Sequence, residues 1–165
     1  MVELVVGADG YIGSHLIKMI PTAMGTTRGH AIYHHLDLLN PEVIPQAEIA
    51  YICAGVNGFQ ACEGNVLSYR TNVDGTLKVA REITKGGGFV VWISSCSVEW
   101  AHSAYSLQKS LVEIALQMIP QTAIVRAGRV VNQNVESLCK LMVEVGRGKK
   151  EGIHLWNTVD MPWRS

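Results

Sequence analysis

The sequence has no excess of charge of either sign, because its 14 lysines and arginines balance its 14 aspartates and glutamates. Basic residues are not clustered apart from Arg147-Gly-Lys-Lys150, which is typical of a solvated helix end. A protein without an excess or a cluster of positive charge does not attract a nucleic acid or an anionic membrane surface electrostatically. We therefore expect neither a nucleic acid nor a membrane among its partners.

Long apolar runs are also absent. No stretch reaches the roughly 18 apolar residues that a membrane-spanning helix needs, and no basic segment precedes the first apolar run. The chain begins directly with an apolar segment of ordinary strand length. We therefore expect a cytoplasmic protein.

The four cysteines and six histidines form no pattern that indicates a disulfide framework or a metal site. No two cysteines make a C-x-x-C pair, and Cys53 and Cys96 fall in apolar runs where a thiol behaves as a small hydrophobe. The histidines lack the i,i+4 or short-loop spacing of metal ligands. We expect reduced, structural cysteines and no metal.

Three glycines lie between the first apolar run and a helix-like segment. Residues 2–6 predict a buried strand, and 13–20 predict a helix that stops at a proline. Gly7, Gly10 and Gly13 leave no side chain where a pyrophosphate would approach the backbone, and the following helix N-terminus favours an anion. Their G-x-x-G-x-x-G spacing differs from the G-x-G-x-x-G dinucleotide fingerprint, so on their own they predict only an anion-binding loop.

Strand-like and helix-like segments alternate through the rest of the chain. Further strands are predicted at 22–27, 31–36, 48–54, 89–93, 122–126 and 153–156, helices after Asn40 and at 66–85, 103–119 and 133–145, and a loop at 56–65. This alternation predicts an α/β fold with a Rossmann-like, doubly wound parallel sheet of about six or seven strands and helices on both faces. A length of 165 residues is enough for a single domain with its own core.

The end of the second predicted strand indicates which cofactor would bind. In a doubly wound nucleotide-binding fold this strand end meets the adenosine ribose, where an acidic residue accepts from the 2′-hydroxyl and an arginine suits a 2′-phosphate. Arg28 stands there, with no aspartate or glutamate nearby. We expect NADP(H) to be favoured over NAD(H); the alternative is that Arg28 is an ordinary exposed loop residue.

Tyr105 and Lys109 stand four residues apart on a predicted helix and therefore project from one face. A tyrosine phenol titrates near 10, and an ammonium about 4 Å away would favour the phenolate by about 4 kcal/mol at an effective dielectric of roughly 20. A serine on the neighbouring strand end could polarise the same substrate oxygen. Such a pair alone is usually a helix surface, but its position after a serine-rich strand end favours a catalytic pair.

Several separated motifs resemble those of the extended short-chain dehydrogenase/reductase superfamily, which contains NAD-dependent epimerases, dehydratases and reductases of nucleotide sugars. The similar segments are Gly7-Ala-Asp-Gly-Tyr-Ile-Gly13, Asp37-Leu38, Cys53-Ala-Gly55, Tyr69-Arg-Thr-Asn-Val-Asp-Gly-Thr76, Ile93-Ser-Ser-Cys-Ser-Val98, Tyr105 to Lys109 and Ile124-Val-Arg-Ala-Gly-Arg-Val130. They follow the order of the family over roughly residues 1–131.

This resemblance implies roles for the matching residues. Tyr105 would be the general acid/base, Lys109 would bind the nicotinamide ribose and lower the pKa of the tyrosine, and Ser95 would contact the reacting oxygen. Ser94 and Ser97 remain alternatives for the active serine.

The resemblance also implies a cofactor site and an assembly. The cofactor-binding residues would be Gly7, Gly10, Tyr11, Ile12, Gly13, Arg28, Asp37, Leu38, Ala54, Gly55, Asn72, Tyr105 and Lys109. Asn72 would act structurally, by holding its helix and an active-site water network. A homodimer would form through the helices at 66–85 and 103–119, and the substrate would be a small molecule whose identity the sequence does not reveal.

Three features depart from the family pattern. Tyr105 stands only ten positions after Ser95, where family members usually have a longer substrate-facing loop. Ala127 replaces the usual proline near the nicotinamide, and family members continue further to build a substrate lobe. We therefore expect 1–131 to form an NAD(P)-binding Rossmann domain and 132–165 to be a short C-terminal helix and tail, the remnant of a substrate lobe.

Together these features predict an NAD(P)-dependent oxidoreductase or epimerase/dehydratase that acts on a carbonyl or hydroxyl substrate, such as a sugar nucleotide, by Tyr-Lys-Ser hydride and proton chemistry. One alternative is a non-catalytic dinucleotide-binding module, either a redox sensor or a partner subunit. Another is a degenerate relative that binds no cofactor.

Overall fold

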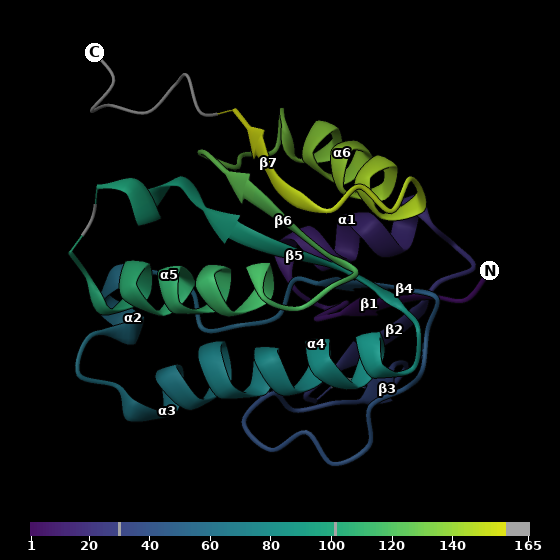
Figure 1. Cartoon of the computed structure of the whole chain (residues 1–165), viewed down its shortest axis with the longest axis horizontal. Helices are drawn as coiled ribbons and strands as arrows, with labels where there is room; N and C mark the ends of the chain where they lie inside the picture. The colour runs from purple at the N-terminus through teal and green to yellow at the C-terminus, as the bar shows by residue number, and fades with distance from the viewer. Residues whose placement is uncertain (30, 101, 158–165) are drawn as a thin grey trace.

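The computed structural model describes residues 1–29, 31–100 and 102–157, which are built around one parallel sheet (Figure 1). Within these ranges the sheet has seven strands in the order β3-β2-β1-β4-β5-β6-β7, and every neighbouring pair is parallel. The strands are β1 (Glu3–Val6), β2 (Met24–Thr27), β3 (His34–His35), β4 (Ile49–Ile52), β5 (Phe89–Ser95), β6 (Thr122–Ala127) and β7 (Gly152–Trp156). The strand order reverses between β1 and β4, which confirms the predicted Rossmann-like, doubly wound fold.

Helices cover both faces of the sheet. They are α1 (Tyr11–Met19), α2 (Phe59–Cys62), α3 (Val66–Tyr69), α4 (Thr76–Lys85), α5 (Ala104–Gln117) and α6 (Val135–Arg147), with a π segment η1 (Arg70–Gly75) and a 3-10 turn η2 (Cys96–Glu99). Helices α1 and α6 lie on one face of the sheet, and α4 and α5 lie on the other (Figure 1). Among the described residues no helix is both long and apolar enough to cross a membrane.

Two apolar layers hold these helices to the sheet, because successive strand residues point to opposite faces. On β5, Phe89 and Val91 pack into the layer under α1 and α6, whereas Val90 and Trp92 pack into the layer under α4 and α5. A strand covered on both sides needs apolar residues at every position. This explains why the unbroken apolar run of β5 predicted its strand correctly.

The edge of the sheet differs from the prediction. The third strand was expected at 31–36, but only His34 and His35 pair with β2, and both are exposed. The helix expected after Asn40 does not form. Pro41 and Pro45 each lack a backbone N–H donor, and each restricts the residue before it, so residues 41–47 form an irregular connection.

The segment expected as a loop at 56–65 contains the one-turn helix α2. The helix predicted at 66–85 is continuous, but its middle is the π segment η1 rather than regular α-helix. A Cβ atom on Gly75, within this segment, would lie 1.8 Å from the carbonyl oxygen of Leu38, so only glycine allows the helix to approach that loop so closely. Single π turns inside helices are frequent at functional sites.

The C-terminal part of the chain joins the same sheet. Helix α6 packs against α1, and β7 pairs in parallel with β6. Helix α6 begins two residues later and ends two residues later than the predicted helix at 133–145. The strand predicted at 153–156 is present as β7. Residues 158–165 of the expected tail lie outside the described residues.

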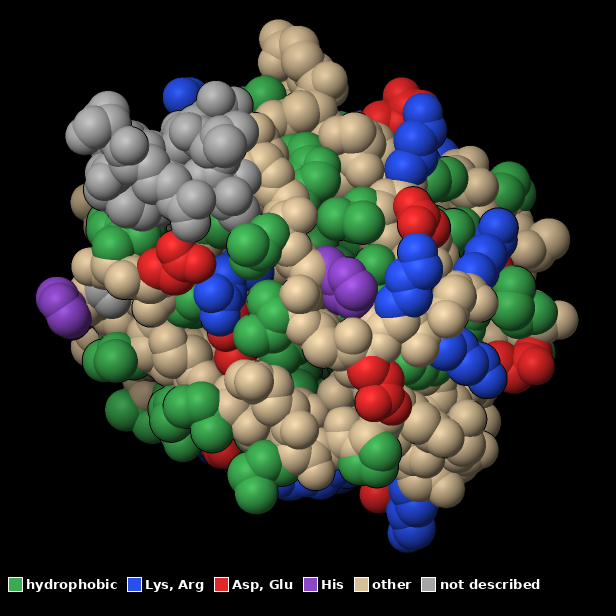
Figure 2. Space-filling model, turned by 45° about the horizontal axis from the view of Figure 1, so that its top comes forward, with side chains coloured by type: hydrophobic (Ala, Val, Ile, Leu, Met, Phe, Trp, Pro, Cys, Tyr) green, Lys and Arg blue, Asp and Glu red, His purple; other side chains and the backbone are tan. Residues whose placement is uncertain are grey.

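Acidic and basic side chains are interspersed on the molecular surface, as the face drawn in Figure 2 shows. An ion pair with a buried carboxylate closes the end of the sheet opposite the carboxyl ends of the strands. Glu3 is buried there, and Arg147 of α6 contacts both of its carboxylate oxygens at 2.9 and 3.1 Å. Tyr51 donates to the same carboxylate at 2.9 Å. This cluster ties α6 to the central strands.

Candidate active site

A cleft of about 560 Å³ follows the carboxyl ends of the strands and crosses the point where the strand order reverses. It is lined by residues at or after the ends of β1, β2, β3, β4, β5 and β6, and by residues of α1, η1 and α5. In open α/β sheets ligands bind at this switch point. The cleft is therefore the place where the fold predicts a ligand.

Most of the predicted site residues line this cleft. They are Gly7, Gly10, Tyr11, Ile12, Arg28, Asp37, Leu38, Ala54, Gly55, Ser95, Tyr105 and Lys109. Gly13 and Asn72 lie behind the lining, where each supports a neighbouring segment. Residues scattered over a hundred positions of sequence are thus brought to one side of the sheet.

The glycine loop is shaped by close backbone contacts. Gly7 has a φ of +86°, which favours glycine, and a Cβ there would lie 2.8 Å from the backbone of Ala54. A Cβ on Gly13 would lie 1.9 Å from the carbonyl oxygen of Gly7. Gly13 therefore acts by letting α1 pack on the loop. Gly10 caps α1, whose first turn carries no acidic residue, so the helix N-terminus can attract an anion.

Two residues with charged side chains stand at one end of the cleft. Arg28 is exposed directly after β2, and Asp37 is half-buried after β3. The Asp37 carboxylate accepts a hydrogen bond from the backbone N–H of Leu39 at 2.9 Å, which fixes its loop. An arginine and a carboxylate thus border the same end of the cleft.

Tyr105, Ser95 and Lys109 meet at the other end. The Ser95 side chain lies beside the Tyr105 phenol and lowers its pKa, and the Ser95 hydroxyl accepts a hydrogen bond from the backbone N–H of Ser97 at 3.2 Å. The Lys109 ammonium lies 5.7 Å from the centre of the Tyr105 ring and donates to the carbonyl oxygen of Ile93 at 2.9 Å. It also lies 4.6 Å from the centre of the Trp92 ring, a favourable cation–π distance.

Burial is the main influence on the protonation of this group. Burial raises the pKa of Tyr105 and outweighs the effect of the Ser95 side chain, which lowers it. Burial also lowers the pKa of Lys109 from its ordinary 10.5 to about 8, against the opposing effects of Cys53, Cys62 and Glu113. The net shift of the Tyr105 pKa is thus upward because desolvation dominates, while the Lys109 ammonium donates to Ile93. That Lys109 lowers the pKa of the tyrosine stays a prediction.

The three candidate serines have different partners. Ser94 is buried and donates to a carboxylate oxygen of Glu113 at 2.6 Å. Ser97 is buried and accepts from the hydroxyl of Ser106 at 3.0 Å. Ser95 is half-buried, faces the cleft and contacts Tyr105. Of the three serines, Ser95 thus stands beside the tyrosine.

Asn72 lies on the π segment, and its side chain holds the loop after β4. Its carbonyl oxygen accepts from the N–H of Val56 at 2.7 Å, and its amide donates to the carbonyl of Val56 at 2.9 Å. The amide also donates to Gln108 at 2.8 Å, and Gln108 donates in turn to Ser68. These contacts link the loop to α3 and α5, which is a structural arrangement.

The sequence motifs did not predict a role for Gln108 or for the Glu113–Arg126 pair. A signal for Glu113 existed, because it stands four residues after Lys109 and eight after Tyr105, on the same helix face. Two aromatic residues were also missed: Phe59 of α2 lies 5.8 Å from the Tyr105 ring and 6.1 Å from the Trp100 ring, in edge-to-face geometry. No sequence motif predicts these aromatic contacts.

The cysteines are all free thiols, as predicted. Cys53 lines the cleft, and burial raises its pKa, so its thiol is protonated at neutral pH. Within the described ranges no group of three or more His, Cys, Asp or Glu residues could hold a metal ion.

Neither a protein-family model nor a curated protein matches the sequence. Solved structures do match. A hypothetical dTDP-4-dehydrorhamnose reductase from Sulfolobus tokodaii aligns with a TM-score of 0.77 and 16% identity, over 94% of this chain and 76% of that chain. A UDP-N-acetylglucosamine 4-epimerase from Methanobrevibacter ruminantium aligns with a TM-score of 0.76 and 14% identity, over 93% and 75%.

A short-chain dehydrogenase from Burkholderia cenocepacia, solved in complex with NADP, aligns with a TM-score of 0.77 and 13% identity, over 96% of this chain and 88% of that chain. At such identities the similarity establishes the fold. The chain has the Rossmann-like α/β fold of this dehydrogenase and of the reductase and epimerase structures.

Proposed function

We propose that the protein is an NAD(P)-dependent oxidoreductase or epimerase/dehydratase of the short-chain dehydrogenase/reductase type, acting on a carbonyl or hydroxyl substrate. The observation that carries this proposal is that Tyr105 and Ser95 lie together at one end of the switch-point cleft, with Lys109 beside them. The similarity of fold to reductases and an epimerase supports it.

The cleft suits a dinucleotide in shape and in chemistry. Gly7 and Gly10 leave backbone exposed next to the N-terminus of α1, where a diphosphate would be stabilised. Arg28 and Asp37 would border the adenosine, and Lys109 would contact the nicotinamide ribose. Because Arg28 can pair with a 2′-phosphate, we propose NADP(H) as the preferred cofactor.

A bound nicotinamide dinucleotide would supply or accept the hydride. Tyr105 would donate a proton from its hydroxyl to the substrate oxygen during reduction and accept it during oxidation. Ser95 would donate a hydrogen bond to the same oxygen. The positive charge of Lys109 would favour the phenolate form of Tyr105 during the reaction.

Two further features belong to this proposal. Residues 1–131 would hold the cofactor, while 132–165 would stand in place of a substrate lobe. The chain would act as a homodimer in the cytoplasm, as expected from its sequence, through the helical regions 66–85 and 103–119. An exposed apolar stripe on α5 supports the dimer: Leu107, Leu111, Ile114 and Met118 are spaced so that they share one face.

A dinucleotide-binding module without catalysis is the second candidate. The observation that favours it is that the described part of 132–165 adds α6 and β7 to the sheet instead of building a separate lobe over the cleft. This candidate predicts tight NADPH binding and no turnover.

Spectrophotometry of NADPH with the purified chain distinguishes the two candidates. Oxidation of NADPH is followed at its absorbance maximum with aldehydes, ketones and a 4-keto sugar nucleotide, while thermal shift reports binding. We expect Tyr105→Phe to lower turnover by about 100-fold or more while NADPH binding persists. Tyr33→Phe, which removes a phenol outside the cleft lining, is the matched control. Unchanged turnover in Tyr105→Phe would refute the assignment.

A further inference from the structure

The end of β5 is joined to α5 through three successive residues. The Ile93 carbonyl accepts from Lys109 at 2.9 Å, Ser94 donates to Glu113 at 2.6 Å, and Ser95 lies beside Tyr105 and lowers the pKa of its phenol. The three helix residues are spaced by four, so they lie one turn apart on one face. The strand end and the helix are therefore held in a single register.

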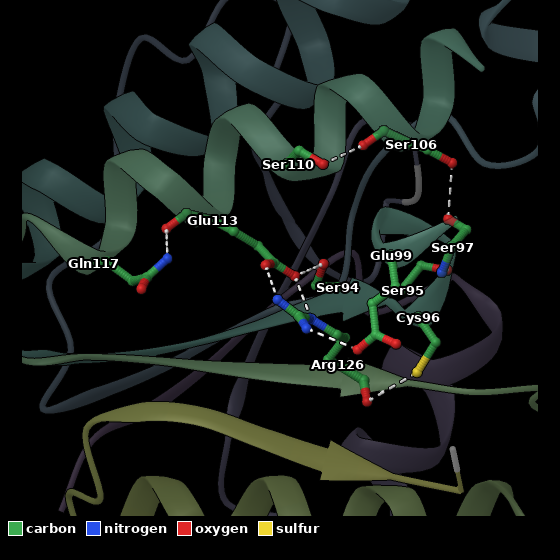
Figure 3. A network of polar contacts seen from close by, with 10 residues as sticks. All are labelled: Ser94, Ser95, Cys96, Ser97, Glu99, Ser106, Ser110, Glu113, Gln117 and Arg126. Atoms are coloured by element: carbon green, nitrogen blue, oxygen red, sulfur yellow. Dashed lines mark hydrogen bonds and ion pairs between the residues drawn. The ribbon is translucent and has the colours of Figure 1, made fainter. Parts of the chain in front are cut away.

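Glu113 is the acidic member of this set, and its hydrogen bonds and ion pair hold it in place. It is 4% exposed, and Arg126 of β6 contacts its two carboxylate oxygens at 3.1 and 2.5 Å (Figure 3). Arg126 also contacts Glu99 at 3.0 Å. A buried carboxylate is tolerated only when it is paired and hydrogen-bonded, and Glu113 has both an arginine and a serine hydroxyl. It is thus anchored to two adjacent strands.

Ser94 lies between the two residues that contact Lys109 and Tyr105. Because Ile93, Ser94 and Ser95 are consecutive in one strand, a displacement of Ser94 moves the peptide groups on both sides. A bond that holds Ser94 therefore also holds its neighbours.

We propose that Glu113, held by Arg126, is a positioning residue that fixes the end of β5 against α5 through Ser94. It thereby sets the distance between the Ser95 and Tyr105 hydroxyls. This inference rests on the proposed function, because it assigns Glu113 to the support of that same site.

Glu113 also acts on Lys109 through its charge. The titratable groups that face Lys109 are Glu113 and Tyr105 on its own helix, Cys53 after β4 and Cys62 on α2. Glu113 is the carboxylate among them, and it raises the pKa of Lys109 against the lowering by burial. Removing this charge should therefore lower the pKa of Lys109 below about 8.

Three variants distinguish the effect of the Ser94–Glu113 hydrogen bond from the effect of the negative charge of Glu113. Glu113→Gln keeps an oxygen that can accept from Ser94 but removes the charge and the pairing with Arg126. Ser94→Ala keeps the ion pair and removes the bond to the strand. Glu99→Gln is the matched control, because it removes another carboxylate partner of Arg126 that does not contact Ser94.

The first readout needs no turnover. With ¹³Cε-labelled lysine, the NMR resonance that is lost in Lys109→Arg reports the titration of Lys109, and ¹³Cζ-labelled tyrosine reports the environment of Tyr105. We expect the Lys109 midpoint to fall by about half a pH unit or more in Glu113→Gln and to stay unchanged in Ser94→Ala and Glu99→Gln. The Tyr105 resonance should move in Glu113→Gln and Ser94→Ala and stay in place in Glu99→Gln.

The second readout is kinetic. Glu113→Gln and Ser94→Ala should lower kcat about tenfold or more with the Kd for NADPH unchanged, since they misplace the reacting hydroxyls without touching the phosphate loop. If folded Glu113→Gln and Ser94→Ala keep wild-type resonances and kcat, the inference is overturned. If Glu113→Gln does not fold, a wild-type Tyr105 resonance in Ser94→Ala overturns it alone. A wild-type protein without turnover contradicts the proposed function, while the NMR result still decides the role of Glu113.

Discussion

The ammonium of Lys109 and the carbonyl of Ile93 form a 2.9 Å hydrogen bond inside the fold, where Lys109 is only 9% exposed. A charged lysine at this depth is costly, because burial disfavours its protonated form. The candidate active site therefore carries a charge whose cost should be measurable as a dependence of stability on pH.

Replacing this lysine should change how stability depends on pH. The folded pKa of Lys109 is about 8 and its ordinary value is 10.5, so between these values the unfolded chain binds more protons and stability rises with pH. The difference corresponds to about 3 kcal/mol at most. Relative to Lys109→Met, the wild-type unfolding free energy should rise by up to this amount from pH 7 to pH 10.5, measured by urea denaturation. A difference that is constant with pH would show that Lys109 is not desolvated.

The general architecture could be predicted because it depends on local patterns. Strands buried on both faces require unbroken apolar runs, as in β5, and the glycine loop follows from Gly7 and Gly13, which no other residue could replace without a clash. The helix expected after Asn40 does not form, because a second proline, Pro45, falls within the expected helix and lacks the backbone N–H donor. The interior of the fold was predicted better than its edge.

The details of the site depend on contacts that no local pattern reports. The pairing of Glu113 with Arg126 requires α5 to pack over β6, which is a long-range relationship. The direction of the Tyr105 pKa shift depends on how deeply the ring is buried. Residue types and spacing identified the catalytic candidates, whereas their protonation and support required the structure.

Arg28→Ala should weaken NADPH binding selectively. Loss of a charge-assisted contact with a 2′-phosphate is expected to raise the Kd for NADPH about tenfold and to leave the Kd for NADH unchanged. Isothermal titration calorimetry with both cofactors measures this. Lys18→Ala, on the exposed side of α1, is the control for loss of one positive charge. An equal loss of affinity for both cofactors would contradict the preference for NADP(H).

Gly13→Ala should destabilise the glycine loop. The added Cβ would lie 1.9 Å from the carbonyl oxygen of Gly7, so α1 must shift. We expect a loss of about 2 kcal/mol or more in unfolding free energy, together with weaker NADPH binding. Gly29→Ala is the matched control, since a Cβ there meets nothing within 4 Å. Chemical denaturation measures the unfolding free energy of both variants. Equal losses in Gly13→Ala and Gly29→Ala would contradict tight packing at Gly13.

A charged substitution in the α5 stripe should disrupt the proposed homodimer. Ile114 is 61% exposed and lies near Leu111 on the same face, so Ile114→Glu places a charge at the centre of the apolar stripe. Light scattering coupled to gel filtration should then report a monomer in place of a dimer. Glu136→Gln, on the exposed surface of α6, should keep the wild-type state. A wild-type protein that is monomeric at micromolar concentration would contradict the proposed homodimer.

The central claim is that the cleft holds a nicotinamide dinucleotide with its reactive ring beside Tyr105. A crystal structure of the chain soaked with NADPH tests it most directly. We predict the diphosphate at Gly7 and Gly10, the ribose of the nicotinamide within hydrogen-bond distance of Lys109 Nζ, and the nicotinamide ring next to the Tyr105 hydroxyl. A dinucleotide bound outside the cleft, or bound with its adenine at Tyr105, would contradict the account.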